Sequence, residues 1–369
     1  MSIAAALATP SVAAADSPGS TVSGYGLNAL RVEWLAEFPL GVDDLGRMGQ
    51  SNIRLYRPRF RQDQVVSGST YDWTRLDNLT RQAALNGVTL VPTLYNMPGE
   101  IYTPPKSKAA IKAFGNFAAA AARRYGSNGS FWGTCGCPKR PINVWEVWNE
   151  ENITPYWDAP NAVEYAKLLT GVRTPLRRAD AGARILIGGL AHPGSTNGTT
   201  RIDPSTFLRT VIQTAGPNSF DAVALHDYHS NPATGVNTAL AATVNTLKTY
   251  AGTGAGGAPR QQVWVNEFGK ATARDDPATT TDEELASEPA QRDWMNGFLD
   301  ALLPHRSDWN LGPVFWYALR DHTETSQTWY RLGLRRTNSD DTDGGAKLAW
   351  DAYVSRSSTA ADVPLPTPR

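Results

Sequence analysis

The stretch Trp145-Glu146-Val147-Trp148-Asn149-Glu150 indicates the fold, because a short run of aromatic and branched residues ends on an Asn-Glu pair. A second run, Val263-Trp264-Val265-Asn266-Glu267-Phe268-Gly269, has the same form and also carries an Asn-Glu pair near its end. Apolar runs of this length are typical of strands buried in a parallel sheet. The two runs therefore predict two buried strands, each with a carboxylate at its carboxyl end.

Short strand-like runs alternate with longer helical patterns along most of the chain. The expected strands cover residues 24–28, 52–57, 88–94, 142–148, 184–188, 221–226, 262–267 and 312–319. The expected helices cover residues 73–85, 108–124, 162–178, 204–215, 238–250, 288–303 and 346–354. Eight strands that alternate with helices, without a break in composition, predict one domain of the α/β class, a (β/α)8 TIM barrel.

The length of 369 residues, with 41% hydrophobic residues, is sufficient for one elaborated barrel. We place the catalytic barrel at residues 21–356 and expect the Pro-rich segment 357–369 to be disordered. Residues 1–20 are rich in alanine, and Ala13-x-Ala15 matches a small-residue cleavage site, so this segment indicates the end of an export signal. The alternative for it is a plain disordered tail. The first interpretation predicts a secreted, extracellular protein.

The charge balance bears on the partner, since Lys plus Arg and Asp plus Glu both number 35. A chain without net charge has no overall field to attract nucleic acid or anionic lipid. No stretch after the N-terminal segment is apolar enough to span a bilayer. The 12 Trp and 13 Tyr offer flat apolar faces with a polar edge, which suit a sugar ring. We expect a carbohydrate partner, no nucleic acid, no membrane, and a monomer.

The two cysteines, Cys135 and Cys137, flank a single glycine in an expected loop. A disulfide between them would close a very short ring and add little stability, and two free thiols remain an equal alternative. No further Cys or His lies close by in sequence to complete a zinc site.

The chemistry follows from the positions of Glu150 and Glu267, which end the fourth and the seventh expected strands. In a (β/α)8 barrel the active site lies at the carboxyl ends of the strands. Cleavage of a glycosidic bond needs one carboxylic acid to protonate the leaving oxygen and one carboxylate at the anomeric centre. A separation of about 5–5.5 Å between the two carboxyl groups leads to retention of configuration, and a wider gap leads to inversion. The two glutamates therefore predict glycoside hydrolysis.

The motif Asn149-Glu150, with Asn152 after it, and the run from Val265 to Gly269 resemble the retaining glycoside hydrolases of clan A. The likeness is to family 39-like enzymes, including exported actinobacterial members. It implies that Glu150 is the general acid/base and that Glu267 is the nucleophile. It also implies that Asn149 holds the 2-hydroxyl of the sugar in the −1 subsite.

The resemblance extends to three other strands and assigns further binding residues. It implies that Arg54, in Ile53-Arg54-Leu55, steadies the nucleophile, and that His226 lines the −1 subsite. Tyr228 would donate a hydrogen bond to the nucleophile, and Trp316 would form the aromatic platform beneath the −1 sugar. The family works without a metal ion or an organic cofactor, and we expect none here.

Two further glutamates stand beside the expected site. Glu151 replaces the proline that usually follows Asn-Glu in these enzymes, and we expect it to face solvent. If it pointed inward, it would raise the pKa of Glu150. Glu146 lies inside the strand, and we interpret it as a structural residue that faces the barrel interior with a partner.

Several alternatives stay open at this point. A barrel that binds carbohydrate without turnover, or a transglycosylase, would share these features. His226 and His229 could form a metal-binding pair, but a third ligand of suitable spacing is missing. Trp148 and Trp264 are expected in the core. Other candidates for sugar contact are Trp34, Tyr95, Asn96, Trp157 and His192.

Overall fold

The structure is a computed structural model. It describes residues 21–28, 39–68, 70–98, 101–154, 156–192, 196–228, 231, 238–272, 286–322, 331–339 and 342–369. Trp34, His229, most of the polar segment 274–286 and residues 1–20 lie outside the described part of the chain.

A parallel sheet forms the centre of the molecule, and its segments follow the order β4-β8-β9-β10-β11-β12-β13-β2-β3-β7. Their bounds are β2 Tyr25–Asn28, β3 Leu55–Arg57, β4 Arg59–Arg61, β7 Thr89–Leu90, β8 Thr93–Tyr95, β9 Val144–Val147, β10 Arg184–Leu190, β11 Ala222–Asp227, β12 Gln262–Phe268 and β13 Leu311–Trp316. All eight strands expected from the sequence are present.

The sheet closes into a barrel because the segments at its two ends, β4 and β7, belong to the second and third strands of the barrel. Pro58 separates β3 from β4, and Val91-Pro92 separates β7 from β8, so each pair is one interrupted strand. Proline has no N–H to donate, which explains the interruptions. Since β3 pairs with β7 and β4 pairs with β8, the second and third strands are neighbours along their whole length. The predicted (β/α)8 barrel is confirmed.

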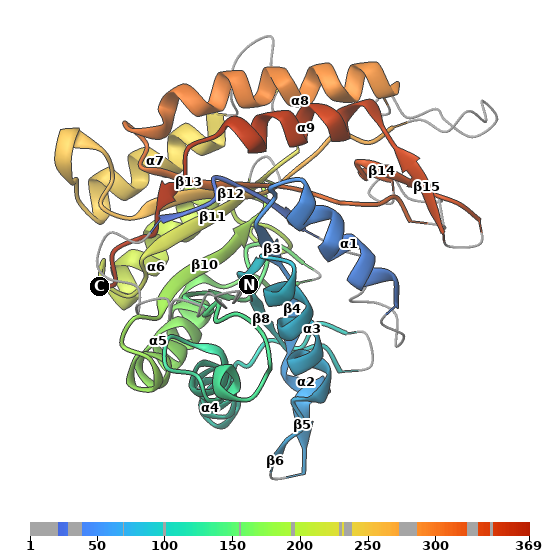
Figure 1. Ribbon diagram of the computed structural model, residues 1–369. Helices are drawn as coiled ribbons and strands as arrows, with labels where there is room; N and C mark the ends of the chain where they lie inside the picture. Colours follow the sequence, from blue (N-terminus) through green and yellow to red (C-terminus); the bar gives the residue numbers. More distant parts are fainter. Residues whose placement is uncertain are drawn as a thin grey trace, which may run out of the picture.

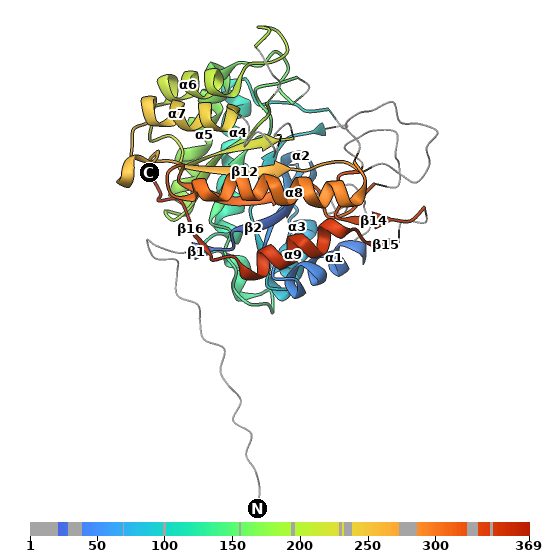
Figure 2. The ribbon, with the colours of Figure 1, turned by 90° about the horizontal axis from the view of Figure 1, so that it is seen from above.

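Helices cover the outside of the barrel (Figures 1 and 2). Their bounds are α1 Pro39–Gln50, α2 Gln62–Val65, α3 Thr74–Leu85, α4 Lys108–Tyr125, α5 Ala162–Ala179, α6 Pro204–Ala215, α7 Thr238–Tyr250, α8 Glu288–Leu302 and α9 Leu348–Thr359, with 3₁₀ turns η3 Ser130–Gly133, η4 Ala255–Gly257 and η6 Leu303–Arg306. The sequence did not predict α1, since its three glycines are poor helix formers. One of them, Gly49, lets this helix approach the end of α3, because a Cβ there would lie 2.1 Å from the Asn86 carbonyl oxygen.

Two apolar layers stabilise the barrel. A large cluster fills the space between the strands and the helices. A smaller one lies inside the barrel and includes Trp264 and Phe315, whose rings stack 6.0 Å apart. Alternate residues of each strand thus enter different layers, as the period of two requires.

The C-terminal segment packs against the amino-terminal end of the barrel. Strand β16, Val363–Pro364, pairs antiparallel with β1, Thr21–Val22 (Figure 2). Leu365 and Val22 contact the apolar cluster inside the barrel. Three hydrogen bonds also join the last residues to the starts of strands. The side chains of Arg184 and Gln262 donate to the carbonyl oxygens of Pro366 and Pro364, and Arg369 N donates to the Asp221 carboxylate. The prediction that residues 357–369 are disordered is therefore wrong.

The C-terminal segment was misjudged because its three prolines suggested disorder, although proline is compatible with a short edge strand. Helix α9 also continues five residues beyond its expected end at residue 354. Residues 357–369 thus belong to the barrel domain.

Three smaller features complete the fold. Cys135 and Cys137 form a disulfide after η3, which decides between the two alternatives left open by the sequence. Two hairpins lie outside the barrel, one of β5 Val66–Ser67 with β6 Thr70–Tyr71 and one of β14 Arg335–Thr337 with β15 Asp343–Ala346. Within the described residues, none of the helices has the length and hydropathy needed to cross a membrane.

Candidate active site

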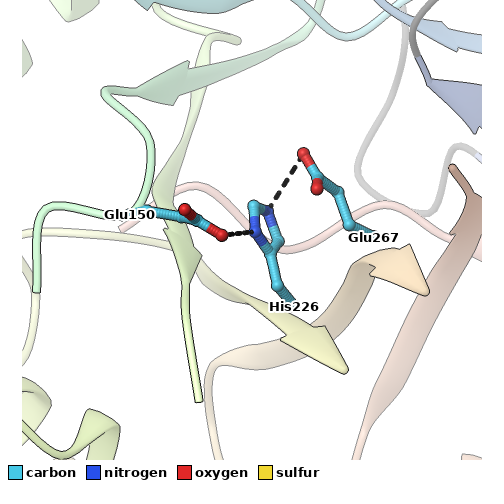
Figure 3. Close-up of side chains that lie close together, drawn as sticks. All are labelled: Glu150, His226 and Glu267. Carbon is cyan, nitrogen blue, oxygen red and sulfur yellow. Dashed lines mark hydrogen bonds and ion pairs between the residues drawn. The ribbon is translucent and has the colours of Figure 1, made fainter. Parts of the chain in front are cut away.

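Glu150 and Glu267 face one another across His226 at the carboxyl end of the barrel, as Figure 3 shows. Glu150 Oε1 lies 2.6 Å from His226 Nδ1, and Glu267 Oε1 lies 3.4 Å from His226 Nε2. One ligand atom from each of the three residues lies within 4.8 Å of the others, an arrangement that could also hold a metal ion. The two carboxylates that the sequence predicted to act together therefore share one site.

The loop that carries Glu150 has an unusual backbone. Trp148 and Glu150 have φ angles of 72° and 47°, a left-handed conformation that is costly for residues other than glycine. The side chain of Asn152 fixes this loop to the end of β10, since its Nδ2 donates to Ala191 O at 2.8 Å and its Oδ1 accepts from Ala191 N at 2.9 Å. These bonds offset the backbone strain and aim Glu150 at the site.

Arg57 connects the nucleophile candidate to the barrel interior. Its Nη1 donates to Glu267 Oε1 at 2.6 Å, and its Nη2 donates to Asn149 Oδ1 at 2.7 Å and to Glu146 Oε1 at 2.9 Å. Glu146 is fully buried and also accepts hydrogen bonds from Gly189 N and from the side chains of Thr93 and Asn266. The interpretation of Glu146 as an interior residue with a partner is confirmed.

The assignment of the steadying arginine to Arg54 is wrong. Arg54 is exposed, lies before the start of β3, and donates to Asn52 Oδ1 at 2.6 Å. Arg57 lies three residues further along, which is about 10 Å nearer the carboxyl end of an extended chain. The position of Arg57 at the end of the strand was the signal in the sequence that could have identified it.

Tyr228 and His226 both contact the glutamate pair. Tyr228 Oη donates to Glu267 Oε2 at 2.7 Å, just after the end of β11. Burial would raise the pKa of Glu267, but the electrostatic effects of His226 and Arg57 and this hydrogen bond outweigh it and lower the pKa below its usual value. Glu267 is therefore held as a carboxylate, the form that attacks as a nucleophile.

The assignment of Trp316 to the sugar platform is wrong. Trp316 is fully buried in the layer between barrel and helices, where it packs against Phe268 and Trp294 and donates from Nε1 to Leu332 O at 2.8 Å. The next residue, Tyr317, is partly exposed, and its ring centroid lies 6.5 Å from that of Tyr228. Because side chains alternate along a strand, Tyr317 and not Trp316 borders the site.

Glu151 is fully buried, so the expectation that it faces solvent is wrong. Gly188 on β10 leaves room for it, since a Cβ at Gly188 would lie 2.5 Å from Glu151 Oε2. Within the described part of the chain, neither oxygen of Glu151 makes a hydrogen bond of normal geometry, although the Tyr165 hydroxyl is close enough to lower its pKa. Burial raises its pKa well above the usual value, and the charges of Glu146 and Glu150 raise it further.

Sequence reasoning missed two tyrosines beside the site. Tyr102 follows β8 and Tyr156 follows β9, and their ring centroids lie 4.6 Å apart. Tyr156 lies six residues after Glu150 on the same loop, and the negative charge of Glu150, followed by burial, raises the pKa of its hydroxyl. Among the other sugar-contact candidates, Tyr95 and Trp157 are buried, Trp157 completely.

The chain is similar to solved structures, although no protein-family model matches it and no curated protein matches it in sequence. A family 39 glycoside hydrolase from the gut symbiont Bacteroides cellulosilyticus WH2 aligns with a TM-score of 0.63 at 17% identity, over 91% of this chain and 63% of that one. A glucosidase from Croceicoccus marinus gives 0.62 at 13% identity, over 96% and 71%. The GH39 enzyme from Xanthomonas axonopodis pv. citri gives 0.62 at 14% identity, over 94% and 68%.

This chain shares the fold of these glycoside hydrolases. The family 39-like resemblance of the motifs is thus confirmed at the level of the fold. The chain spans 63% of the length of the Bacteroides enzyme, and at these identities the likeness concerns the fold and not the activity.

Proposed function

We propose that this protein is a retaining glycosidase with Glu267 as nucleophile and Glu150 as general acid/base. The observation that carries the proposal is the spacing of the two carboxylates, which bring oxygens within 4.8 Å of each other. Retaining enzymes place the two carboxyl groups about 5–5.5 Å apart, and inverting enzymes place them roughly 6.5–9.5 Å apart to admit a water. The spacing here favours double displacement.

In the first step, Glu267 attacks the anomeric carbon and forms a C–O bond as the glycosidic C–O bond breaks. The leaving oxygen takes its proton from Glu150. Arg57 and Tyr228 each hold one oxygen of Glu267 and keep it ionised before the attack. Asn149 is fixed by Arg57, so its amide nitrogen is available for the 2-hydroxyl of the sugar.

In the second step, Glu150 is a carboxylate and removes a proton from water. The water oxygen attacks the anomeric carbon, and Glu267 leaves as a carboxylate. His226 holds the Glu150 side chain through the 2.6 Å contact at Nδ1. A sugar acceptor in place of water would give transglycosylation by the same chemistry.

The proposal is tested with Glu267→Gln and Glu150→Ala on a panel of aryl glycosides and plant and bacterial polysaccharides. Glu267→Gln should lose turnover on every substrate. Glu150→Ala should keep activity on glycosides whose leaving group needs no proton, and added azide should restore turnover with a glycosyl azide as product. Near-wild-type rates in both variants would overturn the proposal.

The stereochemistry of the first product supplies an independent measurement. Proton NMR during the first minutes of hydrolysis should show the same anomer as the substrate. The opposite anomer would replace the retaining mechanism by an inverting one without affecting the assignment as a glycosidase.

A barrel that only binds carbohydrate would need neither an ionised Glu267 nor its contacts to Arg57 and Tyr228. Calorimetry that shows sugar binding without any product over days would nevertheless favour a binding protein.

We also propose that the protein is secreted. The Cys135–Cys137 disulfide supports this proposal, since such bonds persist in oxidising compartments.

A further inference from the structure

Tyr102 and Tyr156 form one wall beside the acid/base candidate. Their rings are tilted by 55° with centroids 4.6 Å apart, and Tyr95 packs behind Tyr102 at 5.7 Å. Tyr156 comes six residues after Glu150, on the same loop. A general acid contacts the leaving group directly, so this wall lies on the leaving-group side, whereas Tyr228 and Tyr317 lie beside Glu267.

Several polar side chains around this wall are used within the protein, and the guanidinium of Arg59 lies over Tyr95, 5.5 Å from its ring centroid. Asn96 Nδ2 donates to Thr103 O at 3.3 Å, and Thr103 Oγ1 donates to Ile101 O at 3.1 Å. Lys106 lies 3.6 Å from Glu164 and also donates to the Asp158 carbonyl. These side chains are therefore committed, and the partly exposed Tyr102 and Tyr156 supply the contact surface of the wall.

The rim of the wall is apolar as well. Ile101 precedes Tyr102 and is 69% exposed, the largest exposure among the large hydrophobic residues that the structure describes. A sugar in this position would need several hydrogen-bond partners for its hydroxyl groups, whereas an aromatic ring needs flat apolar contact.

The wall is also fixed in shape. Trp148 Nε1 donates to Tyr156 O at 2.9 Å, and the ammonium of Lys106 lies 5.9 Å from the ring centroid of Trp157. Thr103 N, next to Tyr102, donates to Asn96 O at 3.1 Å. A wall held in this way loses little conformational entropy when a ligand binds.

We propose that Tyr102, Tyr156 and Ile101 form a leaving-group subsite that selects glycosides with an aromatic aglycone. This inference rests on the proposed glycosidase function and adds the chemical class of the leaving group. An aromatic aglycone can be held by this apolar contact alone, whereas a sugar stacked on the same rings would also need partners for its hydroxyl groups.

The experiment compares kcat/KM for an aryl glycoside and for a disaccharide with the same glycone, in wild type and in Tyr102→Ala and Tyr156→Ala. Wild type should prefer the aryl glycoside. Each alanine variant should lower the aryl-to-disaccharide ratio by about 3- to 10-fold, the effect of one lost aromatic contact. Tyr250→Ala, which removes an exposed tyrosine at the end of α7, is the control and should leave the ratio unchanged.

A second measurement separates this inference from the proposed function. Calorimetry with Glu267→Gln should show tighter binding of a phenyl glycoside than of the matching methyl glycoside, and Tyr156→Ala in that background should abolish the difference. If wild type cleaves nothing, the proposed function fails, and this titration still shows whether the subsite binds an aromatic aglycone. A wild-type preference for the disaccharide, or equal binding of the two glycosides, would overturn the inference.

Discussion

The guanidinium of Arg57 joins the fully buried carboxylate of Glu146 to the site, because it donates to both Glu146 oxygens and to Glu267. Arg57 is 7% exposed, so solvent screens these charges little. A buried charge that loses its partner destabilises a protein by about 3–5 kcal/mol. Glu146, three residues before Asn149, is thus the fixed anion that orients the arginine.

Arg57→Gln should therefore lower both stability and activity. The free energy of unfolding should fall by about 3 kcal/mol or more, because Glu146 keeps its charge and loses its ion pair. In any residual activity, the acid limb of the kcat/KM profile should move to higher pH, because the charge of Arg57 no longer lowers the pKa of Glu267. Arg54→Gln is the matched control, because Arg54 is exposed before the same strand. Equal effects of the two substitutions would contradict this assignment.

Tyr228→Phe should alter the nucleophile and leave the fold intact. The variant removes the 2.7 Å hydrogen bond to Glu267 Oε2, which helps to lower the pKa of that carboxyl. A nucleophile must be ionised, and activity is lost as pH falls through its pKa. A raised pKa therefore moves this loss to higher pH, and kcat/KM at the optimum should fall by about tenfold or more. An unchanged acid limb would show that Tyr228 does not act on Glu267.

Trp316 and Tyr317 should have separate effects although they are neighbours in sequence. Trp316→Ala should cost about 3–5 kcal/mol of unfolding free energy, because it empties a buried site against Phe268 and Trp294. Tyr317→Ala should cost much less stability and should raise KM, because its ring borders the site. Denaturant unfolding and steady-state kinetics on the same two variants check this. A larger KM effect from Trp316→Ala would restore the original assignment.

The sequence predicted the barrel well because each strand and most helices have a local pattern. The periodicity of apolar residues and the Asn-Glu motif both act over a few residues, so the eight strands and both glutamates were identified. Arg54 and Trp316 were wrong because a motif match fixes the neighbourhood of a residue but not its exact position. Arg54 lies three residues before the end of its strand, and Trp316 lies one residue before Tyr317, a shift that exchanges the two faces.

The remaining errors depended on contacts between distant parts of the chain. Glu151 is buried because Gly188, 37 residues later, leaves a space beside it, and no local pattern contains that fact. Tyr102 and Tyr156 meet because two loops are joined through Lys106. The C-terminal segment is ordered because its backbone pairs with Thr21–Val22 at the other end of the chain.

Glu151→Gln should change the pH dependence of stability. The folded-state pKa of Glu151 is raised by burial, so the folded chain keeps a proton that the unfolded chain releases as pH rises past about 4.3. The contribution of Glu151 is therefore fully present below that pH and is lost as pH rises towards the folded-state pKa. Glutamine does not ionise, so this loss should be absent in the variant.

The measurement is the difference in Tm between Glu151→Gln and wild type from pH 4 to pH 7. We expect this difference to move in favour of the variant as pH rises, because only wild type must keep an acid neutral in a buried site. Asp351→Asn, on an exposed position of α9, controls for the loss of a carboxylate elsewhere. A Tm difference that stays constant across this range would mean that Glu151 ionises in the folded protein as readily as in the unfolded chain, and that a group able to solvate its charge reaches the space beside Gly188.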